Sequence, residues 1–420
     1  DGRLVATLTA ATQVGAYRGL ETFSQLVSFD FDEKLYSIGC VPWTIMDFPR
    51  FSHRELLVDT GRHFLSPTTL KTIISALPSV KINVLHWHLI DTQAFPLESK
   101  RNPLLSKLGA FSPAERYSSE DVAEVVEWAR QHGVRVVPEI DVPGHAASWC
   151  KGYPEICPSP NCTQPLSPVT PTPLTPSASN ATWMILEGLF SDVAEMFPDA
   201  MIHLGGDEVN TACWSEAPAI STWLQQNNVS AAEALTGFLQ RAHELAASHN
   251  RQVTCWDEVW TTMGKALPQE AIVQLWRGEK KADFVRNVTT AGNRVIWSQD
   301  PIWYLDQLAV TWDKAWAVDI CQDVPDELCK KVIGGGGEQW GETVDASDAL
   351  QTIFPRLAAI AEALWSSNKR MSFPGGDKEG SAVRMAELRC LLNRRGIAAA
   401  PLNNSHARAA PPGPGACLLQ

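Results

Sequence analysis

The stretch "MIHLGGDEVN", residues 201–210, is an apolar strand that runs through two glycines into two adjacent acids, Asp207 and Glu208. Side chains at consecutive positions of a strand point to opposite faces of a sheet. Two neighbouring acids on a regular strand are therefore poorly placed to serve one site. The same pattern, an apolar run that ends in polar residues, returns along most of the chain, and this repetition indicates the fold.

Eight apolar runs with this pattern alternate with segments of helical periodicity. The runs are residues 55–60, 82–91, 134–141, 200–208, 251–259, 270–278, 293–299 and 330–342, and helical segments between them include 66–77, 118–133, 182–197 and 283–292. Parallel strands need crossover connections, which are usually helices, and eight such units are typical of a closed (β/α)8 TIM barrel. An open doubly wound sheet is the alternative, but "GGGG" at 334–337 lacks the spacing of a phosphate-binding loop.

Three parts of the chain lie outside this series. Residues 1–48 contain an amphipathic helical pattern at 16–27 and then a short strand pair, and they predict the remnant of a small N-terminal α/β domain. The barrel then spans 49–402, and residues 403–420 predict an extended C-terminal tail. Residues 157–183, after the third strand, are rich in Pro, Ser and Thr and predict a long loop.

Charge and hydropathy exclude two classes of partner. The chain has 47 acidic and 35 basic residues, a net charge of −12, and no long run of Lys or Arg. Nucleic acid is therefore not an expected partner. No apolar stretch reaches the roughly 18 residues that a membrane span needs.

Cysteines and glycosylation motifs indicate the compartment. The ten cysteines include no CxxC pair, and their even number suits disulfides. Five Asn-x-Ser/Thr motifs begin at Asn161, Asn180, Asn228, Asn287 and Asn403. Together these features favour the secretory pathway, with a lysosomal, vacuolar or extracellular destination.

Polar and aromatic residues collect at the ends of the predicted strands, where barrel enzymes carry their active sites. In strand order they are Asp59 and Arg62; His86, Trp87, His88 and Asp91; Glu139, Asp141 and His145; Asp207 and Glu208; Trp256, Asp257 and Glu258; Trp276; Trp303, Tyr304 and Asp306; and Trp340 and Glu342. Acids or indoles at nearly every strand end are difficult to explain by solvation alone. We therefore expect a functional site at this rim.

Two kinds of chemistry compete for these residues. His86 and His88, with His145 and Asp207, could form a metal site, which needs three or four converging ligands. His203, His243 and His249 lie within a strand or on helical segments and not at later strand ends. We therefore favour a structural role for His86 and His88, hydrogen-bonded beneath the site, and we expect neither a metal nor another cofactor.

Glycoside cleavage is the second possibility, because indoles, one Arg and several acids suit a neutral hydroxylated ligand. A retaining enzyme with a protein nucleophile places its two carboxyls about 5 Å apart across the anomeric carbon. Adjacent acids such as Asp207 and Glu208 are poorly placed for that arrangement. They are well placed if one protonates the leaving oxygen while the other orients a group that belongs to the substrate.

Six short strings together resemble a known family. "RFSHRELLVDTGRHF", "NVLHWHLIDTQAFP", "PEIDVPGH", "HLGGDEV", "WYLDQ" and "WGE" are similar, in order and spacing, to β-N-acetylhexosaminidases of glycoside hydrolase family 20. The resemblance runs from about residue 5 to about residue 402. It implies an exo-acting hydrolase that removes terminal β-linked GlcNAc or GalNAc from glycans or chito-oligosaccharides. A GlcNAc-binding protein without turnover, on the same scaffold, is the alternative.

The resemblance also implies roles for the rim residues. The 2-acetamido oxygen of the substrate attacks C1, Glu208 is the general acid and then the base, and Asp207 holds the acetamido N–H. Tyr304 matches a tyrosine that hydrogen-bonds the acetamido oxygen. Residues matching substrate-binding positions are Arg62, Asp306 and Glu342 for sugar hydroxyls, Trp256, Trp276 and Trp340 as pocket walls, and Asp91 with His145 behind the acid. The family further suggests a homodimer as an assembly to test.

The resemblance extends to disulfides and also has departures. It implies pairs Cys162–Cys213 and Cys390–Cys417, whereas Cys321–Cys329 is our own expectation from proximity in sequence. Cys40, Cys150, Cys157 and Cys255 stay unassigned. The run "GGGGEQ" before Trp340 replaces a more usual run that contains a Cys, and Gln307 after Asp306 gives no indication of a preference for 6-sulfated sugars.

Overall fold

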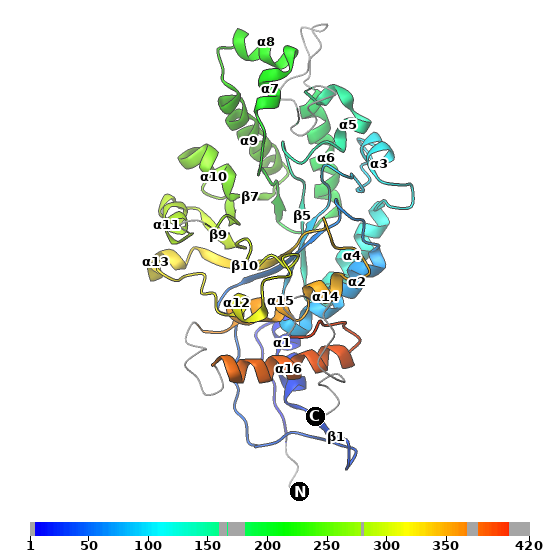
Figure 1. Cartoon of the computed structure of the whole chain (residues 1–420), viewed down its shortest axis with the longest axis vertical. Coiled ribbons are helices and arrows are strands. Elements are labelled where there is room, and N and C mark those ends of the chain that lie inside the picture. Colours follow the sequence, from blue (N-terminus) through cyan, green and yellow to red (C-terminus); the bar gives the residue numbers. More distant parts are fainter. Residues whose placement is uncertain (1–4, 159–165, 167–180, 279–280, 368–376, 403–420) are drawn as a thin grey trace.

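Eight parallel strands close into a barrel in this computed structural model, which describes residues 5–158, 166, 181–278, 281–367 and 377–402 (Figure 1). Around the barrel the order is β10-β3-β4-β5-β6-β7-β8-β9. The strands are β3 (His53–Asp59), β4 (Val84–His88), β5 (Arg135–Glu139), β6 (Met201–His203), β7 (Gln252–Trp256), β8 (Ile272–Leu275), β9 (Arg294–Trp297) and β10 (Val332–Gln339). Each predicted apolar run overlaps one of them, so the TIM-barrel prediction is confirmed and the open sheet is excluded.

The glycine run in β10 serves the closure of the barrel. β10 pairs in parallel with β3, with Gly334 opposite His53 and Gly336 opposite Glu55. A Cβ at Gly334 would lie 1.7 Å from the His53 carbonyl oxygen, and one at Gly336 would lie 2.0 Å from Glu55 Cγ. Side chains are therefore excluded here by a neighbouring backbone and by a buried acid.

Helices connect the strands and cover the barrel (Figure 1). They are α2 (Pro67–Ala76), η1 (Leu77–Val80), α3 (Leu104–Gly109), α4 (Ser119–Gln131), α5 (Trp149–Gly152), η2 (Pro154–Ile156), α6 (Ala181–Met196), α7 (Ala212–Glu216), α8 (Pro218–Gln226), α9 (Ala231–Ser248), α10 (Asp257–Met263), η3 (Gly264–Ala266), α11 (Lys281–Ala291), α12 (Trp312–Trp316), α13 (Asp326–Cys329), α14 (Ala349–Ile353), α15 (Arg356–Trp365) and α16 (Lys378–Arg394). Ser118 and Asp121 form a capping box at the start of α4, which satisfies backbone N–H groups that a helix start leaves unpaired. The apolar core lies between these helices and the strands.

The N-terminal segment contributes a helix and a hairpin. α1 (Gln13–Leu26) is followed by β1 (Ser28–Asp30) and β2 (Leu35–Ser37), which pair antiparallel as a separate sheet. Arg18 on α1 donates to the carbonyls of Ile82, at 3.0 Å, and Gly133, at 2.8 Å, and so docks α1 on the barrel. The helix and strand pair appear where the sequence predicts them, while the domain boundary at residue 48 stays a prediction.

Two disulfides join described cysteines. Cys321–Cys329 is the pair expected from proximity, and Cys150–Cys157 joins two cysteines that the sequence left unassigned. Cys213 and Cys390 are also disulfide-bonded, and their expected partners Cys162 and Cys417 lie outside the described residues. Cys40 and Cys255 carry free thiols.

The described surface bears on the remaining expectations. Asn228 and Asn287, which begin two of the glycosylation motifs, are exposed, and the asparagines that begin the other three motifs fall outside the described residues. Most of the predicted loop at 157–183 and the predicted tail at 403–420 also fall outside them. Among the residues that are described, no helix combines the length and apolarity that crossing a membrane requires.

Candidate active site

The two adjacent acids converge because the regular strand has already ended. β6 stops at His203, and Gly205, Gly206 and Glu208 then take positive φ values of 60°, 94° and 49°. A Cβ at Gly205 would lie 1.9 Å from an oxygen of Asp141, so this position requires glycine. The alternation of strand side chains therefore does not apply beyond His203, and it does not prevent Asp207 and Glu208 from serving one site.

Both acids lie next to the same imidazole, that of His145. His145 Nε2 lies 3.5 Å from Asp207 Oδ2 and 3.5 Å from Glu208 Oε2. His145 itself has a positive φ of 50° and follows β5. Such backbone conformations are unfavourable by about 1–3 kcal/mol for a non-glycine residue and often mark functional sites. The strand ends of β5 and β6 thus bring these three side chains together.

A chain of charged groups extends from the other side of His145, and we call Arg62, Asp91 and His145 the backing chain. His145 Nδ1 lies 3.2 Å from Asp91 Oδ1, and Asp91 Oδ2 lies 2.9 Å from Arg62 Nε. Arg62 also contacts Asp59 at 2.9 Å and Glu342 at 3.5 Å. Its guanidinium carbon lies 5.1 Å from the centre of the Trp340 ring, a cation–π distance. The structure thus joins residues from four predicted strand ends.

Charge alternates along the backing chain and shifts the pKa of each member. Burial opposes the charge on His145, but hydrogen bonds with Asp91 and Glu208 raise the pKa of its imidazole to about 12. Burial likewise opposes the charge on Asp91, but contacts with His145, His88 and Arg62 hold the pKa of that carboxyl well below its ordinary value. The chain therefore presents a cationic imidazole to the two acids.

The pKa values of the two acids, Glu208 and Asp207, shift in opposite directions. The hydrogen bond from His145 lowers the pKa of Glu208, whose side chain is 62% exposed. Burial raises the pKa of Asp207, whose side chain is 14% exposed. Asp141, buried behind Asp207, accepts the Gly206 N–H at 2.8 Å, and burial and the charge of Asp207 raise its pKa well above the ordinary value. Asp141 is therefore the carboxyl of the buried pair that retains a proton.

Aromatic side chains stand beside the acids. The Trp340 ring lies 6.0 Å from Trp256 and 6.1 Å from Tyr304, and Tyr304 stacks at 6.5 Å from Trp276, all between ring centres. The Trp276 indole N–H donates to Glu258 at 2.8 Å. Trp256 is only 1% exposed, so it lies beneath the other rings as a floor and not as an open wall.

At the rim, Asp306 keeps a buried oxygen atom, Oδ1, without a hydrogen-bond partner among the described residues. Burial raises the pKa of Asp306 to about 6. The neighbouring Tyr304 is held by a parallel bridge to Glu338 at the end of β10. Unpartnered buried polar atoms are rare in folded proteins, and at a rim they suit hydrogen bonds to a bound ligand.

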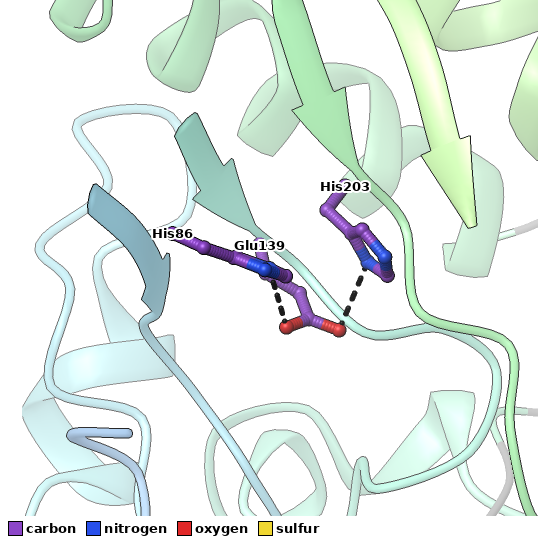
Figure 2. A group of neighbouring side chains, drawn as sticks. All are labelled: His86, Glu139 and His203. Carbon is purple, nitrogen blue, oxygen red and sulfur yellow. Dashed lines mark ion pairs between the residues drawn. The ribbon is translucent and has the colours of Figure 1, made fainter. Parts of the chain in front are cut away.

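The histidines of "HWH" do not join His145 and Asp207 in one metal-like group. His86 groups with Glu139 and His203 inside the barrel (Figure 2), whereas His145 and Asp207 group with Asp141. In the first group, Glu139 lies 2.9 Å from His86 and 3.0 Å from His203. The hypothesis of a metal held by His86, His88, His145 and Asp207 is therefore wrong in geometry, and His86 and His88 lie in contacts beneath the rim.

Three of the strand-end acids that the sequence left without a role support the site. Asp59 holds Arg62 and accepts the Gly341 N–H at 2.9 Å, so it ties the ends of β3 and β10 together. Asp141 accepts a hydrogen bond from the turn before Asp207. Glu139 contacts the histidines inside the barrel, beneath the rim. Their position at strand ends was visible in the sequence, but nothing in the sequence reports which partner each acid faces.

The chain is similar to known proteins in sequence and in fold. Residues 51–368 match the family described as "Glycosyl hydrolase family 20, catalytic domain". The chain is 43% identical to "Beta-hexosaminidase 3" of Arabidopsis thaliana over 99% of this chain and 75% of that protein. It is 37% identical to the human "Beta-hexosaminidase subunit beta" over 95% of this chain and 70% of that protein. The solved chitobiase of Flavobacterium johnsoniae aligns with TM-score 0.78 and 30% identity, covering 91% of this chain and 57% of that chain.

Proposed function

The chain belongs to glycosyl hydrolase family 20, and from this premise we propose that it is an exo-acting β-N-acetylhexosaminidase. The proposed reaction removes terminal β-linked GlcNAc or GalNAc from glycans or chito-oligosaccharides with net retention at C1. The observation that carries the proposal is the convergence of Asp207 and Glu208 on one nitrogen of His145, each at 3.5 Å.

This convergence favours a nucleophile that belongs to the substrate. Retaining enzymes with a protein nucleophile place two carboxyls on opposite sides of the anomeric carbon, about 5 Å apart, and family 20 is an exception to that rule. In the proposed mechanism the 2-acetamido oxygen attacks C1 and forms an oxazolinium ion. Glu208 protonates the leaving oxygen and later takes a proton from water. Asp207 accepts the acetamido N–H and stabilises the positive charge, while Tyr304 donates to the acetamido oxygen.

The remaining rim residues are proposed to hold the sugar. Arg62, Asp306 and Glu342 bind hydroxyls, and Trp276 and Trp340 stack against the ring above the floor that Trp256 forms. The fixed charge of Arg62 supports this role, because the carboxylates of Asp59, Asp91 and Glu342 outweigh burial and raise its pKa. The unpartnered Oδ1 of Asp306 supports it as well.

Hydrolysis of a chromogenic N-acetylglucosaminide tests the proposal. We expect turnover by the wild type and a loss of about 10²–10⁴-fold in Glu208→Gln, which has no transferable proton. Glu270→Gln is the matched control, because Glu270 is an exposed acid before β8. Equal rates for wild type and Glu208→Gln would contradict the proposal. Binding of N-acetylglucosamine by a wild type that releases no product would favour the non-catalytic alternative.

The proposed compartment and assembly have separate tests. We propose the secretory pathway, with a lysosomal, vacuolar or extracellular destination, and the disulfides Cys150–Cys157 and Cys321–Cys329 support an oxidising compartment. Enzymatic removal of N-linked glycans should reduce the mass of peptides that contain Asn228 or Asn287. We also propose a homodimer, and sedimentation equilibrium at several concentrations would show a monomer mass if this is wrong.

A further inference from the structure

We propose that Glu139 is a positioning residue, whose buried carboxylate holds the floor indole Trp256 and the backing chain behind Glu208 in one network. The inference rests on the proposed function, because it assigns Glu139 an effect on the same rim. Glu139 lies at the end of β5, inside the barrel, and its side chain is 0% exposed.

Glu139 is surrounded by side-chain nitrogens from three strands. Its Oε1 accepts the Trp256 indole N–H at 2.9 Å and lies 3.0 Å from His203 Nδ1. Its Oε2 lies 2.7 Å from His88 Nδ1 and 2.9 Å from His86 Nε2. Figure 2 shows His86 from β4 and His203 from β6 pointing toward this carboxylate. One acid thus contacts strands β4, β6 and β7.

His88 carries the network upward to the rim. Its Nδ1 faces Glu139, and its Nε2 lies 2.9 Å from Asp91 Oδ2. Asp91 in turn contacts His145, which contacts Glu208. An imidazole that donates from both nitrogens must be protonated, and the pKa of His88 is raised well above its ordinary value, because the charge of Glu139 and the hydrogen bond to Asp91 outweigh burial.

The charge of Glu139 is balanced within the barrel. Burial opposes ionisation, but the charges of His88, His203 and His86 hold the pKa of Glu139 well below its ordinary value. Two further acids face the same interior, namely Glu55 from β3, which lies 3.9 Å from His86, and Glu338 from β10.

Glu139 also acts on the two acids above it. Its negative charge contributes to the raised pKa of Asp207 and to that of Asp141, which lies beyond it on the same chain segment. Loss of this charge therefore lowers the pKa of Asp207. Since Asp207 must be ionised to hold the acetamido group, the acid limb of the pH profile is the property that reports on Glu139.

Glu338 provides a matched control inside the same barrel. It is equally buried, yet burial and the charge of Glu55 raise its pKa well above the ordinary value, so it is neutral. Glu338→Gln exchanges a neutral carboxyl for a neutral amide of the same shape. Glu139→Gln makes the same exchange of atoms but removes a negative charge and one of the two carboxylate oxygens that face Trp256 and His88.

The experiment measures kcat, KM and the pH profile of kcat/KM for wild type, Glu139→Gln and Glu338→Gln. We expect Glu139→Gln to lower kcat by about 10–100-fold, as expected for a lost charge-assisted hydrogen-bond network. We also expect its acid limb to move to lower pH. Glu338→Gln should stay within about threefold of wild type with both limbs in place. Wild-type limbs in Glu139→Gln, or equal shifts in both variants, would overturn the proposal.

Glu139→Asp distinguishes the effect of the negative charge from the effect of side-chain length. It also provides a test if Glu139→Gln does not fold. The shorter side chain keeps the charge but cannot contact both Trp256 and His88, so kcat should fall while the acid limb stays at the wild-type pH. Full activity of Glu139→Asp would overturn the positioning role. An inactive wild type would instead contradict the proposed function, so the two failures are distinguishable.

Discussion

The rim and the interior of the barrel contain the same chemical groups in two different settings. At the rim, Glu208 is 62% exposed beside the imidazole of His145. In the interior, Glu139 is 0% exposed beside the imidazoles of His86 and His203. Both settings shift the pKa of their carboxyls, so a shifted pKa alone does not distinguish them. Exposure to solvent distinguishes the two settings, because a group that exchanges protons with a substrate must be accessible to that substrate.

Each region also divides a pair of acids into one with a raised and one with a lowered pKa. At the rim the hydrogen bond from His145 lowers the pKa of Glu208, whereas burial raises that of Asp207. In the interior the pKa of Glu139 is lowered by its histidines, and that of Glu338 is raised by burial. The comparison teaches that neighbours, and not residue type, determine which acid acts as a fixed charge.

After Glu208→Gln, the largest effect is expected at the rim, from Asp207→Asn. We expect a loss of about 10²–10³-fold in kcat on an N-acetylglucosaminide, because the variant cannot stabilise the positive charge that forms on the acetamido group. The same substitution should have far less effect on a matched glucoside that lacks the acetamido group. Steady-state rates on both substrates make the comparison. Equal losses on the two would contradict the role of Asp207 as a partner of that group.

The pH dependence of the wild type follows from the lowered pKa of Glu208. The general acid must start protonated, and the protonated fraction falls as pH rises through this pKa. We therefore expect kcat/KM to be greatest at acidic pH and to fall by about tenfold for each pH unit beyond the limb. Initial rates over a range of buffers give the profile. A profile that stays flat to about pH 8 would show that Glu208 does not act as a free-enzyme acid.

A smaller effect is expected from the backing chain, with Asp91→Asn. This variant removes the carboxylate that lies between His145 and Arg62. His145, with its pKa raised to about 12, stays protonated at acidic pH, whereas the lost charge of Asp91 is one that raises the pKa of Glu208. We expect kcat to fall by about 10–100-fold and the alkaline limb to move to lower pH, because the pKa of Glu208 falls. A pH profile of the variant, with circular dichroism as a folding control, checks this. An alkaline limb at the wild-type pH would show that Asp91 does not influence the pKa of Glu208.

The smallest effect on catalysis is expected far from both regions, at the disulfide Cys321–Cys329. Replacing both cysteines with Ser should lower the free energy of unfolding by about 2–3 kcal/mol, since the bridge constrains a short loop in the unfolded chain. The melting temperature should fall by several degrees, with kcat/KM of the folded protein unchanged. Differential scanning calorimetry and the chromogenic assay make the two measurements. A large loss of kcat/KM would connect this bridge to the rim.

The sequence predicts the barrel and most of the rim for a physical reason. Alternation of apolar runs with helical segments indicates the eight strands, and polar residues after each run indicate where the site must lie. It could not show how Asp207 and Glu208 converge, because this depends on positive φ values at Gly205 and Gly206. Nor could it show that Trp256 is a buried floor, since an indole after a strand suits either position.

The contacts of Glu139 inside the barrel could not be predicted from the sequence either. Glu139, His86 and His203 come from three strands, and their contacts depend on how far each strand is offset from the next around the closed barrel. The pairing of Cys150 with Cys157 illustrates the same limit at short range. Spacing alone allowed several partners, and the fold of α5 and η2 brings these two together. The domain boundary at residue 48 and the roles of the rim residues stay predictions.

The central claim is that the amide of the substrate attacks C1 while Asp207 and Glu208 assist from one side. The most direct measurement is the intact mass of wild type and of Glu208→Gln, quenched in acid during turnover of an N-acetylglucosaminide with an activated leaving group. The account predicts unmodified protein in both samples. A mass increase of one N-acetylhexosaminyl group, mapped to either acid as an ester, would contradict it.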